Sequence, residues 1–498
     1  MSAALTRFVL LAAWLSSSPL ALAQAPEPEG RAEADEQAAP AEPAPQTPAP
    51  KQPAPEQAEP AEQREPGAPA LRRQAVRADE ARGYAREPRT EPEDIALAVP
   101  RAVLAVPRYA LRLALWPVRE GIEFLDRHAV VEEVTDVLYN DARNAAVLPT
   151  LSYDSYFGPS LGVRAFHEDL AGYGELGSVE VKAGGVYNLA TQLHFRADHY
   201  GGSHLWLESV ARYESAPALL FQGLGTHREI EGGSGLSPRE AAVATRFSER
   251  RLLSLLRAGY DLGRPSQLLQ LGGTVSYNVR DFGAKQKGAE PSIEEAYDTT
   301  QLVGFDDRVA ILEADLSLVV DLRDVAGATS SGAYLELFAG RAPSIGRYGF
   351  WHHGAELTTY LDLYRKTRVL VLRAMLEGVE GDEAEIPFSE LPRLGGVSRL
   401  RGYPLDRFRD EKAALGTIEY RYPIHQYVAG ALYCDVGRVE QRYSDLLDST
   451  WKVGFGGGFV VRSREREIFT FDVAYGEGVQ VHLTTQPLRA FAKRNTEL

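Results

Sequence analysis

The residue types best suited to specific chemistry are charged side chains in the last third of the chain. Arg401 is followed by Gly402, and charged groups return at Glu419, Arg421 and Asp435. A guanidinium and a carboxylate form a bidentate ion pair where they meet away from water, and Gly402 would let a loop fold back sharply and carry Arg401 to such a place. The alternative is a solvated Arg401 in a loop and an Asp435 that is simply an inward polar residue. The chemistry is ion pairing in either case and not catalysis.

Motifs for catalysis or metal binding are weak elsewhere. The run 233–235 fails as a nucleophile elbow because Leu236 stands where a glycine is needed. The glycines of 453–461 fit close backbone approach in a sheet better than phosphate binding. His352-His353 has no ligand partner at useful spacing and is expected in a loop or at a rim, and the lone Cys434 excludes a disulfide. We therefore expect no enzyme, no metal and no cofactor.

A period of two predicts the elements that position these residues. From about Leu148 onward, polar side chains alternate with Leu, Val, Tyr and Phe, as in 160–166, 178–189, 192–200, 368–376 and 469–476. About sixteen such segments occur at about 22 residues each, which is the spacing of strands of about 9–11 residues that cross a membrane tilted. The predicted fold class is all-β, with a sixteen-stranded antiparallel transmembrane β-barrel over 146–498.

Closure of this sheet follows from the solvent around it. An open edge would leave unpaired amide groups in lipid, at a cost of several kcal/mol each. Turn residues predict short turns near Asn188, Pro265 and Gly476, alternating with long loops at the opposite end of the barrel. The long loops are expected over 214–245, 281–307 and 381–410. A soluble sandwich or propeller is the alternative, but no blade-length repeat is visible.

The chain before the barrel has three predicted parts. Residues 1–23 have the Arg7 charge, the short apolar core and the Ala21-Leu22-Ala23 site of a secretory signal peptide. Residues 24–92 are rich in Pro, Ala and Glu and are predicted to be a disordered linker. In 93–145 apolar residues recur at helical spacing between prolines, which predicts a short amphipathic helical segment. We expect that segment on the periplasmic membrane face or inside the barrel as a plug, with packing on a soluble core as the alternative.

Several short motifs in the C-terminal half belong together by order and spacing. Paired glycines precede a hydrophobe-Arg-Gly-aromatic tetrad, and Glu-x-Arg-x-Pro and aromatic-x-Asp-x-Gly follow it. The matching residues are Gly395 and Gly396, then Leu400, Arg401, Gly402 and Tyr403, then Glu419, Arg421 and Pro423, then Tyr433, Asp435 and Gly437, with an earlier Asp321, Arg323 and Asp324. This set resembles the signature of the bacterial surface antigen barrels, which include BamA/TamA-type assembly factors and two-partner-secretion transporters. The resemblance implies that Arg401 lies in the lumen and contacts Asp435.

The resemblance also implies a role, with one departure. Relatives that insert or secrete polypeptides carry periplasmic POTRA domains, and 71–145 shows no clear strands, so we expect no such domain here. We expect a cell outer membrane protein that acts in protein assembly or translocation through a weak seam between its first and last strands. The alternatives are a pore or a lipid or solute channel, and a structural surface scaffold.

Partners follow from the same interpretation. We expect the lipid bilayer as the main partner, with other outer-membrane or periplasmic proteins as further partners, and a monomer. The net charge of −15 argues against nucleic acid, because phosphate contacts need clustered Lys and Arg.

Overall fold

The computed structural model describes residues 138–484. Within that range 171, 173, 199–202, 226–243, 265–266, 326–328, 345–346, 426–427, 448–449 and 463–466 are excepted. The predicted signal peptide, the linker, most of the amphipathic segment, the run 233–235 and the expectation about POTRA domains therefore lie outside the described residues. Among the described residues, no helix is long and apolar enough to cross a membrane.

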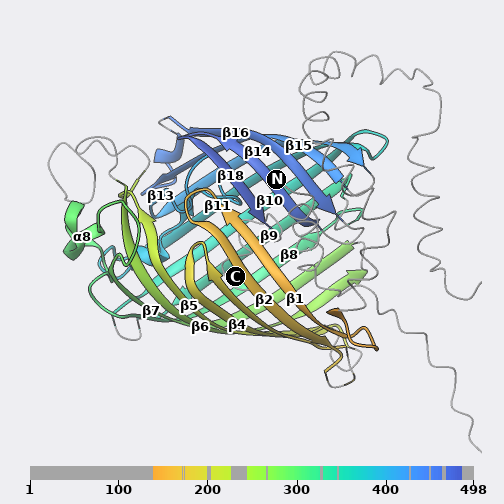
Figure 1. The fold of residues 1–498 in the computed structure, drawn as a ribbon, viewed down its shortest axis with the longest axis horizontal. Coiled ribbons are helices and arrows are strands. Elements are labelled where there is room, and N and C mark those ends of the chain that lie inside the picture. The colour runs from red at the N-terminus through yellow and green to blue at the C-terminus, as the bar shows by residue number, and fades with distance from the viewer. Residues whose placement is uncertain are drawn as a thin grey trace, which may run out of the picture. The chain divides into compact units, whose positions relative to one another are not determined.

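Sixteen strands close into one antiparallel barrel, as the period-two pattern predicts (Figure 1). In chain order they are β1 (Ala145–Asp154), β2 (Gly158–Glu168), β3 (Leu176–Gly184), β4 (Tyr187–Ala197), β5 (Leu205–Phe221), β6 (Thr245–Arg264), β7 (Gln267–Ala284), β8 (Val309–Asp321), β9 (Gly332–Ala342), β10 (Phe350–Tyr364), β11 (Arg368–Gly381), β14 (Lys412–His425), β15 (Val428–Glu440), β16 (Lys452–Arg462), β17 (Glu467–Tyr475) and β18 (Val479–Thr484). The remaining elements are the short strands β12 (Arg393–Leu394) and β13 (Phe408–Arg409), the helix α8 (Ile293–Ala296), and the 3-10 turns η2 (Thr299–Gln301), η3 (Phe388–Glu390) and η4 (Asp445–Leu447).

The alternating side chains make the barrel wall apolar outside and polar inside. Leu252, Leu256 and Leu316 point outward and are 48%, 54% and 73% exposed. Charged residues on the inner face are the buried ones, and Arg212 and Glu356 are each 2% exposed. This is the reverse of a water-soluble sheet, and it is the arrangement that lipid around the barrel and a polar lumen require.

The long loops lie at one end of the barrel, which we call the loop end. Because neighbouring strands alternate in direction, the connections 222–244, 285–308 and 382–411 all fall at this end, close to the predicted ranges. The sequence predicted that the three short turns lie at the end opposite the long loops, and this is wrong for two of the three turns. The turns 185–186 and 476–478 are also at the loop end, because an even number of strands separates each from a long loop. Of the three, only the connection from β6 to β7 falls at the opposite end, the turn end.

An aromatic cluster orders the long loops over β5 to β7. Phe221 and Phe247, at the loop ends of β5 and β6, pack with Ile293 of α8 and with Phe388 of η3. Phe388 also lies 4.7 Å, ring centre to ring centre, from Phe282. Such packing gives these loops a hydrophobic core of their own. By comparison, the loop-end hairpins β1–β2 and β3–β4 have connections of only a few residues.

The seam between the first and last strands has few backbone contacts. β1 and β18 pair only at Tyr153 with Leu483 and at Asp154 with His482. By contrast, β6 and β7 pair continuously from Phe247 to Arg264. Among the described residues, the seam is therefore the shortest ladder of the barrel.

Candidate functional site: a loop anchored in the lumen

The loop between β11 and β14 turns inward as a hairpin. Its stem is the two-residue ladder in which Arg393 pairs with Arg409 and Leu394 with Phe408. Gly395 and Gly396 leave the stem at φ of +120° and +85°, conformations that side chains other than glycine rarely adopt. A Cβ on Gly395 would also lie 2.0 Å from the Pro404 carbonyl oxygen. The paired glycines of the motif therefore start the return of the loop.

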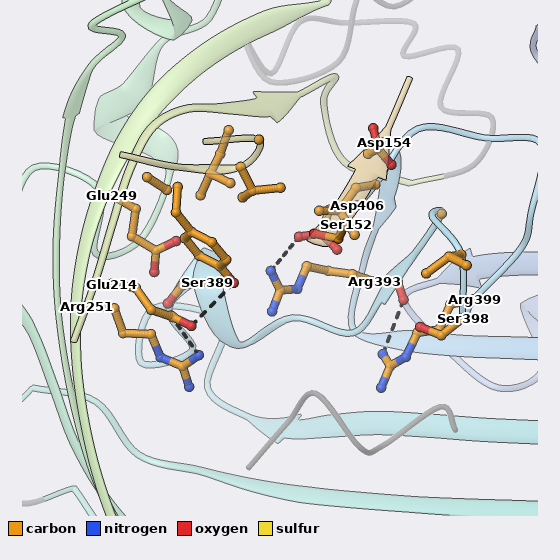
Figure 2. A pocket seen from close by; sticks show the side chains of 18 of the residues that line it. Ser152, Asp154, Glu214, Glu249, Arg251, Ser389, Arg393, Ser398, Arg399 and Asp406 are labelled. Carbon is orange, nitrogen blue, oxygen red and sulfur yellow. Dashed lines mark hydrogen bonds and ion pairs between the residues drawn. The ribbon is translucent and has the colours of Figure 1, made fainter. Parts of the chain in front are cut away.

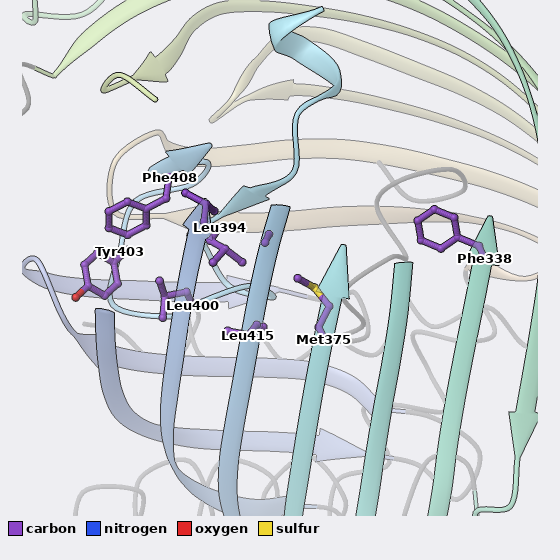
Figure 3. Close-up of a cluster of buried hydrophobic side chains, with 9 residues drawn as sticks. Phe338, Met375, Leu394, Leu400, Tyr403, Phe408 and Leu415 are labelled. Atoms are coloured by element: carbon purple, nitrogen blue, oxygen red, sulfur yellow. The ribbon is translucent and has the colours of Figure 1, made fainter. Parts of the chain in front are cut away.

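Apolar side chains hold this hairpin against the inner wall (Figure 3). Leu400 and Tyr403 of the loop tip pack with Leu394 and Phe408 of the stem and with Met375 of β11. Burial raises the pKa of Tyr403, so its hydroxyl stays protonated and donates to the Val453 carbonyl at 3.2 Å. A Cβ on Gly437 of β15 would come within 3.2 Å of Leu400, so this motif glycine makes room for the tip.

The tip backbone is bent so that Arg401 faces the wall. Leu400 has φ of +72° and Gly402 has φ of +93°. A Cβ on Gly402 would lie 2.7 Å from the backbone of Tyr475, and the Gly402 carbonyl accepts from the Glu477 amide at 3.0 Å. Glycine is needed here both for its backbone angle and for its closeness to the strand.

Arg401 is the centre of a buried ion-pair network. Its Nε and Nη2 donate to the two oxygens of Asp435 at 2.8 and 2.9 Å, and its backbone N–H donates to Asp435 Oδ2 at 2.9 Å. Nη1 donates to Glu419 Oε2 at 2.9 Å, and the Cζ atom lies 3.3 Å from the ring centre of Tyr433. Arg401 is 5% exposed and Asp435 is 2% exposed. A bidentate pair sheltered in this way is among the stronger polar contacts a protein makes.

The carboxylates of this network have further partners on the wall. Thr417 donates to Asp435 Oδ1 at 2.9 Å, and Arg421 donates to Glu419 Oε1 at 2.6 Å. The structure thus brings together Arg401, Glu419, Arg421 and Asp435 of the sequence-derived set. A buried charge with all its hydrogen bonds made is tolerated, whereas one left alone is not.

The sequence reasoning missed Gly454 as part of this site. A Cβ on Gly454 of β16 would lie 1.8 Å from the Arg401 carbonyl oxygen. The glycine run of β16 could have indicated this contact. The sequence predicted a close backbone approach at these glycines, but not that this loop is the segment that approaches. The missing side chain at Gly454 therefore lets the loop tip lie directly against the backbone of β16.

A second anchor, also missed, holds the other side of the tip. Arg399 Nη1 lies 2.6 Å from Glu377 Oε2 on β11, and Arg373 Nη1 donates to the Ser398 carbonyl at 2.9 Å. His352 Nε2 lies 3.0 Å from the other oxygen of Glu377. Arg399 and Arg401 thus point from one loop tip to different strands of the wall.

We expect Arg399→Ala to destabilise the seated loop by about 1–3 kcal/mol, because Glu377 keeps His352 but loses a charged donor. Thermal unfolding of the purified barrel in detergent measures this. The exchanged pair Arg399→Glu with Glu377→Arg should recover most of the loss. If the exchanged pair is as unstable as the two single changes together, the contact does not act as an anchor.

Other sequence-derived residues lie apart from this network. Arg323 pairs with Asp321 at 2.6 Å at the turn end of β8, and Pro423 lies at the turn end of β14 beside a register shift. The histidines at 352 and 353 are in β10, so their predicted place in a loop or at a rim is wrong; His352 faces the lumen and is 6% exposed. The described residues contain no group of three or more side chains that could hold a metal.

A polar cavity of about 310 Å³ lies between the loop and the wall of β1 to β7 (Figure 2). Opposite charges line it in pairs, such as Arg251 with Glu214 at 3.5 Å and Arg393 with Asp406 at 2.7 Å. The cavity also reaches Tyr153 and Leu483, the pair that closes the seam. The lumen therefore has open space on the side of the seam and is filled by the loop on the other.

An apolar outer wall, a closed ladder, a charged lumen and an inserted loop define a transmembrane β-barrel of the outer membrane. The model of the Omp85 superfamily domain matches residues 169–490, and the chain belongs to this superfamily. The fold class and the location that the sequence predicted are thereby confirmed. The comparison with curated proteins finds no match.

Solved structures with a similar fold are also found. BamA from Haemophilus ducreyi lacking POTRA domains 1–3 is 12% identical with a TM-score of 0.48, over 68% of this chain and 69% of that one. CdiB from Escherichia coli (11%, TM-score 0.45) and CdiB from Acinetobacter baumannii (11%, 0.43) each cover 68% of this chain, and the chain spans 62% and 58% of theirs. The chain thus covers less than two thirds of either CdiB.

Proposed function

We propose that this barrel assembles or translocates other polypeptides at the outer membrane, and that the seam between β1 and β18 is the part of the barrel that carries out this activity. The observation that supports this most is the two-pair ladder at the seam. A strand edge that opens in a membrane favours pairing with another strand, because lipid offers its amide groups no bonds.

The anchored loop supports the same proposal. Arg401 and Arg399 fix the loop tip to β11, β14 and β15, opposite the seam-side cavity. The loop is thereby fixed to the wall, and it also reaches the turn between β17 and β18 beside the seam, where the Gly402 carbonyl accepts from the Glu477 amide. We propose a structural role for the motif residues Arg401, Gly402 and Asp435, and a transport role rather than an enzymatic one for the protein.

A disulfide across the seam tests the proposal. Cysteines at Tyr153 and Leu483, which are directly opposite, are placed in a Cys434→Ser background. If the seam must open, oxidation should reduce the levels of other outer-membrane proteins as strongly as deletion of the chain, and dithiothreitol should restore them. The control pair replaces Leu316 and Ala339, which face each other on β8 and β9 and should have no effect.

A pore is the second candidate, because the cavity beside the loop is lined by charged groups. Planar bilayers with the purified protein distinguish the two functions. Stable conductance, together with unchanged levels of other outer-membrane proteins after deletion, would support the pore and contradict the assembly role.

A further inference from the structure

A row of polar side chains runs along the inner wall from the Arg401 anchor to the seam. Tyr433 of β15 lies under the Arg401 guanidinium, and Asp472 of β17 comes next, beyond a glycine stretch of β16. Asp472 is directly opposite His482 of β18, and His482 is directly opposite Asp154 of β1. The row therefore connects the two features on which the proposed function depends.

Three atoms in this row have no hydrogen-bond partner among the described residues. They are the Tyr433 hydroxyl, Asp472 Oδ2 and His482 Nε2. Asp472 is 1% exposed and His482 is 2% exposed. A buried carboxylate that accepts no hydrogen bond costs free energy. Nearby donors and cations are therefore attracted to it.

The glycines of β16 let these side chains lie along the wall. A Cβ on Gly456 would be 2.7 Å from the Tyr433 hydroxyl, and one on Gly458 would be 2.7 Å from Asp472 Oδ1. With any larger residue at these positions, Tyr433 and Asp472 could not approach each other across β16. The glycine stretch thus leaves room for polar side chains to lie between the Arg401 anchor and the last two strands, β17 and β18.

Few charges act on Asp472, and they come from both ends of the row. The cations are Arg401 of the loop and His482 of β18, and the anions are Glu419 and Asp435 of the anchor. While the loop is seated, Arg401 balances part of this negative charge. Without Arg401, Asp435 loses its ion-pair partner and Glu419 keeps Arg421, so His482 becomes the main cation that acts on Asp472.

His482 already has a role in the seam. Its Nδ1 lies 3.3 Å from Asp154 Oδ2, and beside it the Ser155 hydroxyl donates to Gln480 Oε1 at 2.8 Å. These side-chain contacts lie beside the two described backbone pairs of the seam and add to what closes it. An imidazole that carries one N–H can donate to Asp154 or to Asp472, but not to both.

We propose that Asp472 is a positioning residue that couples the loop anchor to the seam by competing with Asp154 for His482. With the loop seated, His482 stays with Asp154 and the seam is closed. When the tip leaves, Asp472 draws the imidazole toward β17, Asp154 loses its partner and the seam loosens. This inference rests on the proposed function only in taking the seam as the part of the barrel that carries out its activity.

The test measures seam closure directly, as the rate at which the cysteine pair at Tyr153 and Leu483 forms a disulfide in purified protein. Arg401→Gln should slow this rate about fivefold or more, the size of an ordinary coupling between sites. In an Asp472→Asn background the same change should slow it less than about twofold. Asp315→Asn, a buried lumen carboxylate on β8, is the matched control and should keep the fivefold effect.

Gly454→Ala provides a second way to unseat the tip if Arg401→Gln does not fold, and it should give the same pattern. An equal slowing with and without Asp472, or no slowing by either loop variant, overturns the proposal. The experiment contains no client polypeptide. A failed coupling therefore leaves the assembly role standing, and a failed assembly role leaves the coupling standing.

Discussion

Arg401→Ala should lower the temperature at which the barrel loses its compact gel mobility, on the order of 10 °C. The change removes the only loop cation that contacts Asp435 and Glu419, both of which are buried. Removing one partner of a buried ion pair costs about 3–5 kcal/mol, because Asp435 then loses its ion-pair partner while Glu419 keeps Arg421. Heat-modifiable mobility of the membrane fraction measures this directly.

Asp435→Ala should have a similar effect, since it leaves Arg401 with Glu419 alone. The double variant decides whether the two residues act as a pair. We expect its loss to be clearly smaller than the sum of the two single losses, because each single change already removes their shared contact. Summed losses would contradict the pairing. Arg323→Ala, which breaks an ion pair at the turn end, is the control and should leave the loop seated.

Gly454→Ala is expected to approach the effect of Arg401→Ala although it removes no polar group. Gly454 has no positive φ, so alanine is allowed by its own backbone, and the obstacle is the Arg401 carbonyl at 1.8 Å from the new Cβ. The tip must then lift from β16, which weakens the anchor it carries. Thermal mobility and the conductance of the lumen in planar bilayers should both change.

The matched control for this change is Gly273→Ala on β7. Its new Cβ would have no neighbour nearer than 3.7 Å, so mobility and conductance should stay as in the parent protein. Combining Gly454→Ala with Arg401→Ala should add little to either single change, because both act on the same seated tip. If the two effects add fully, Gly454 acts on the strand and not on the loop.

The class of fold was predictable because lipid restricts the possible structures so strongly. A period of two over the C-terminal part of the chain, with turn residues between segments and no blade-length repeat, favours a closed wall with one apolar face over a soluble sheet. Segment 178–189 shows the limit of the pattern, since it covers parts of β3 and β4 and the turn between them. Glycine there serves equally well in a strand or in a turn.

The motif residues were found from the sequence for a different reason. Arg401, Gly402 and Asp435 are ordinary residue types for a loop and a wall, but their order and spacing carry the family resemblance. Arg399 and Asp472 gave no such signal. An arginine in a loop and an aspartate on an inner face are ordinary residues until the wall opposite them is known.

The sequence by itself determined that the chain forms a lipid-facing barrel with a charged interior, because side-chain alternation and the bonding needs of buried amides are local properties. Only the tertiary structure decided where the loop rests, which carboxylates receive its arginines and which side chains meet at the seam. Those features depend on contacts such as Arg401 with Gly454 and His482 with Asp154, between residues far apart in the chain. Closing the barrel brings them together, and no local pattern records which strand faces which.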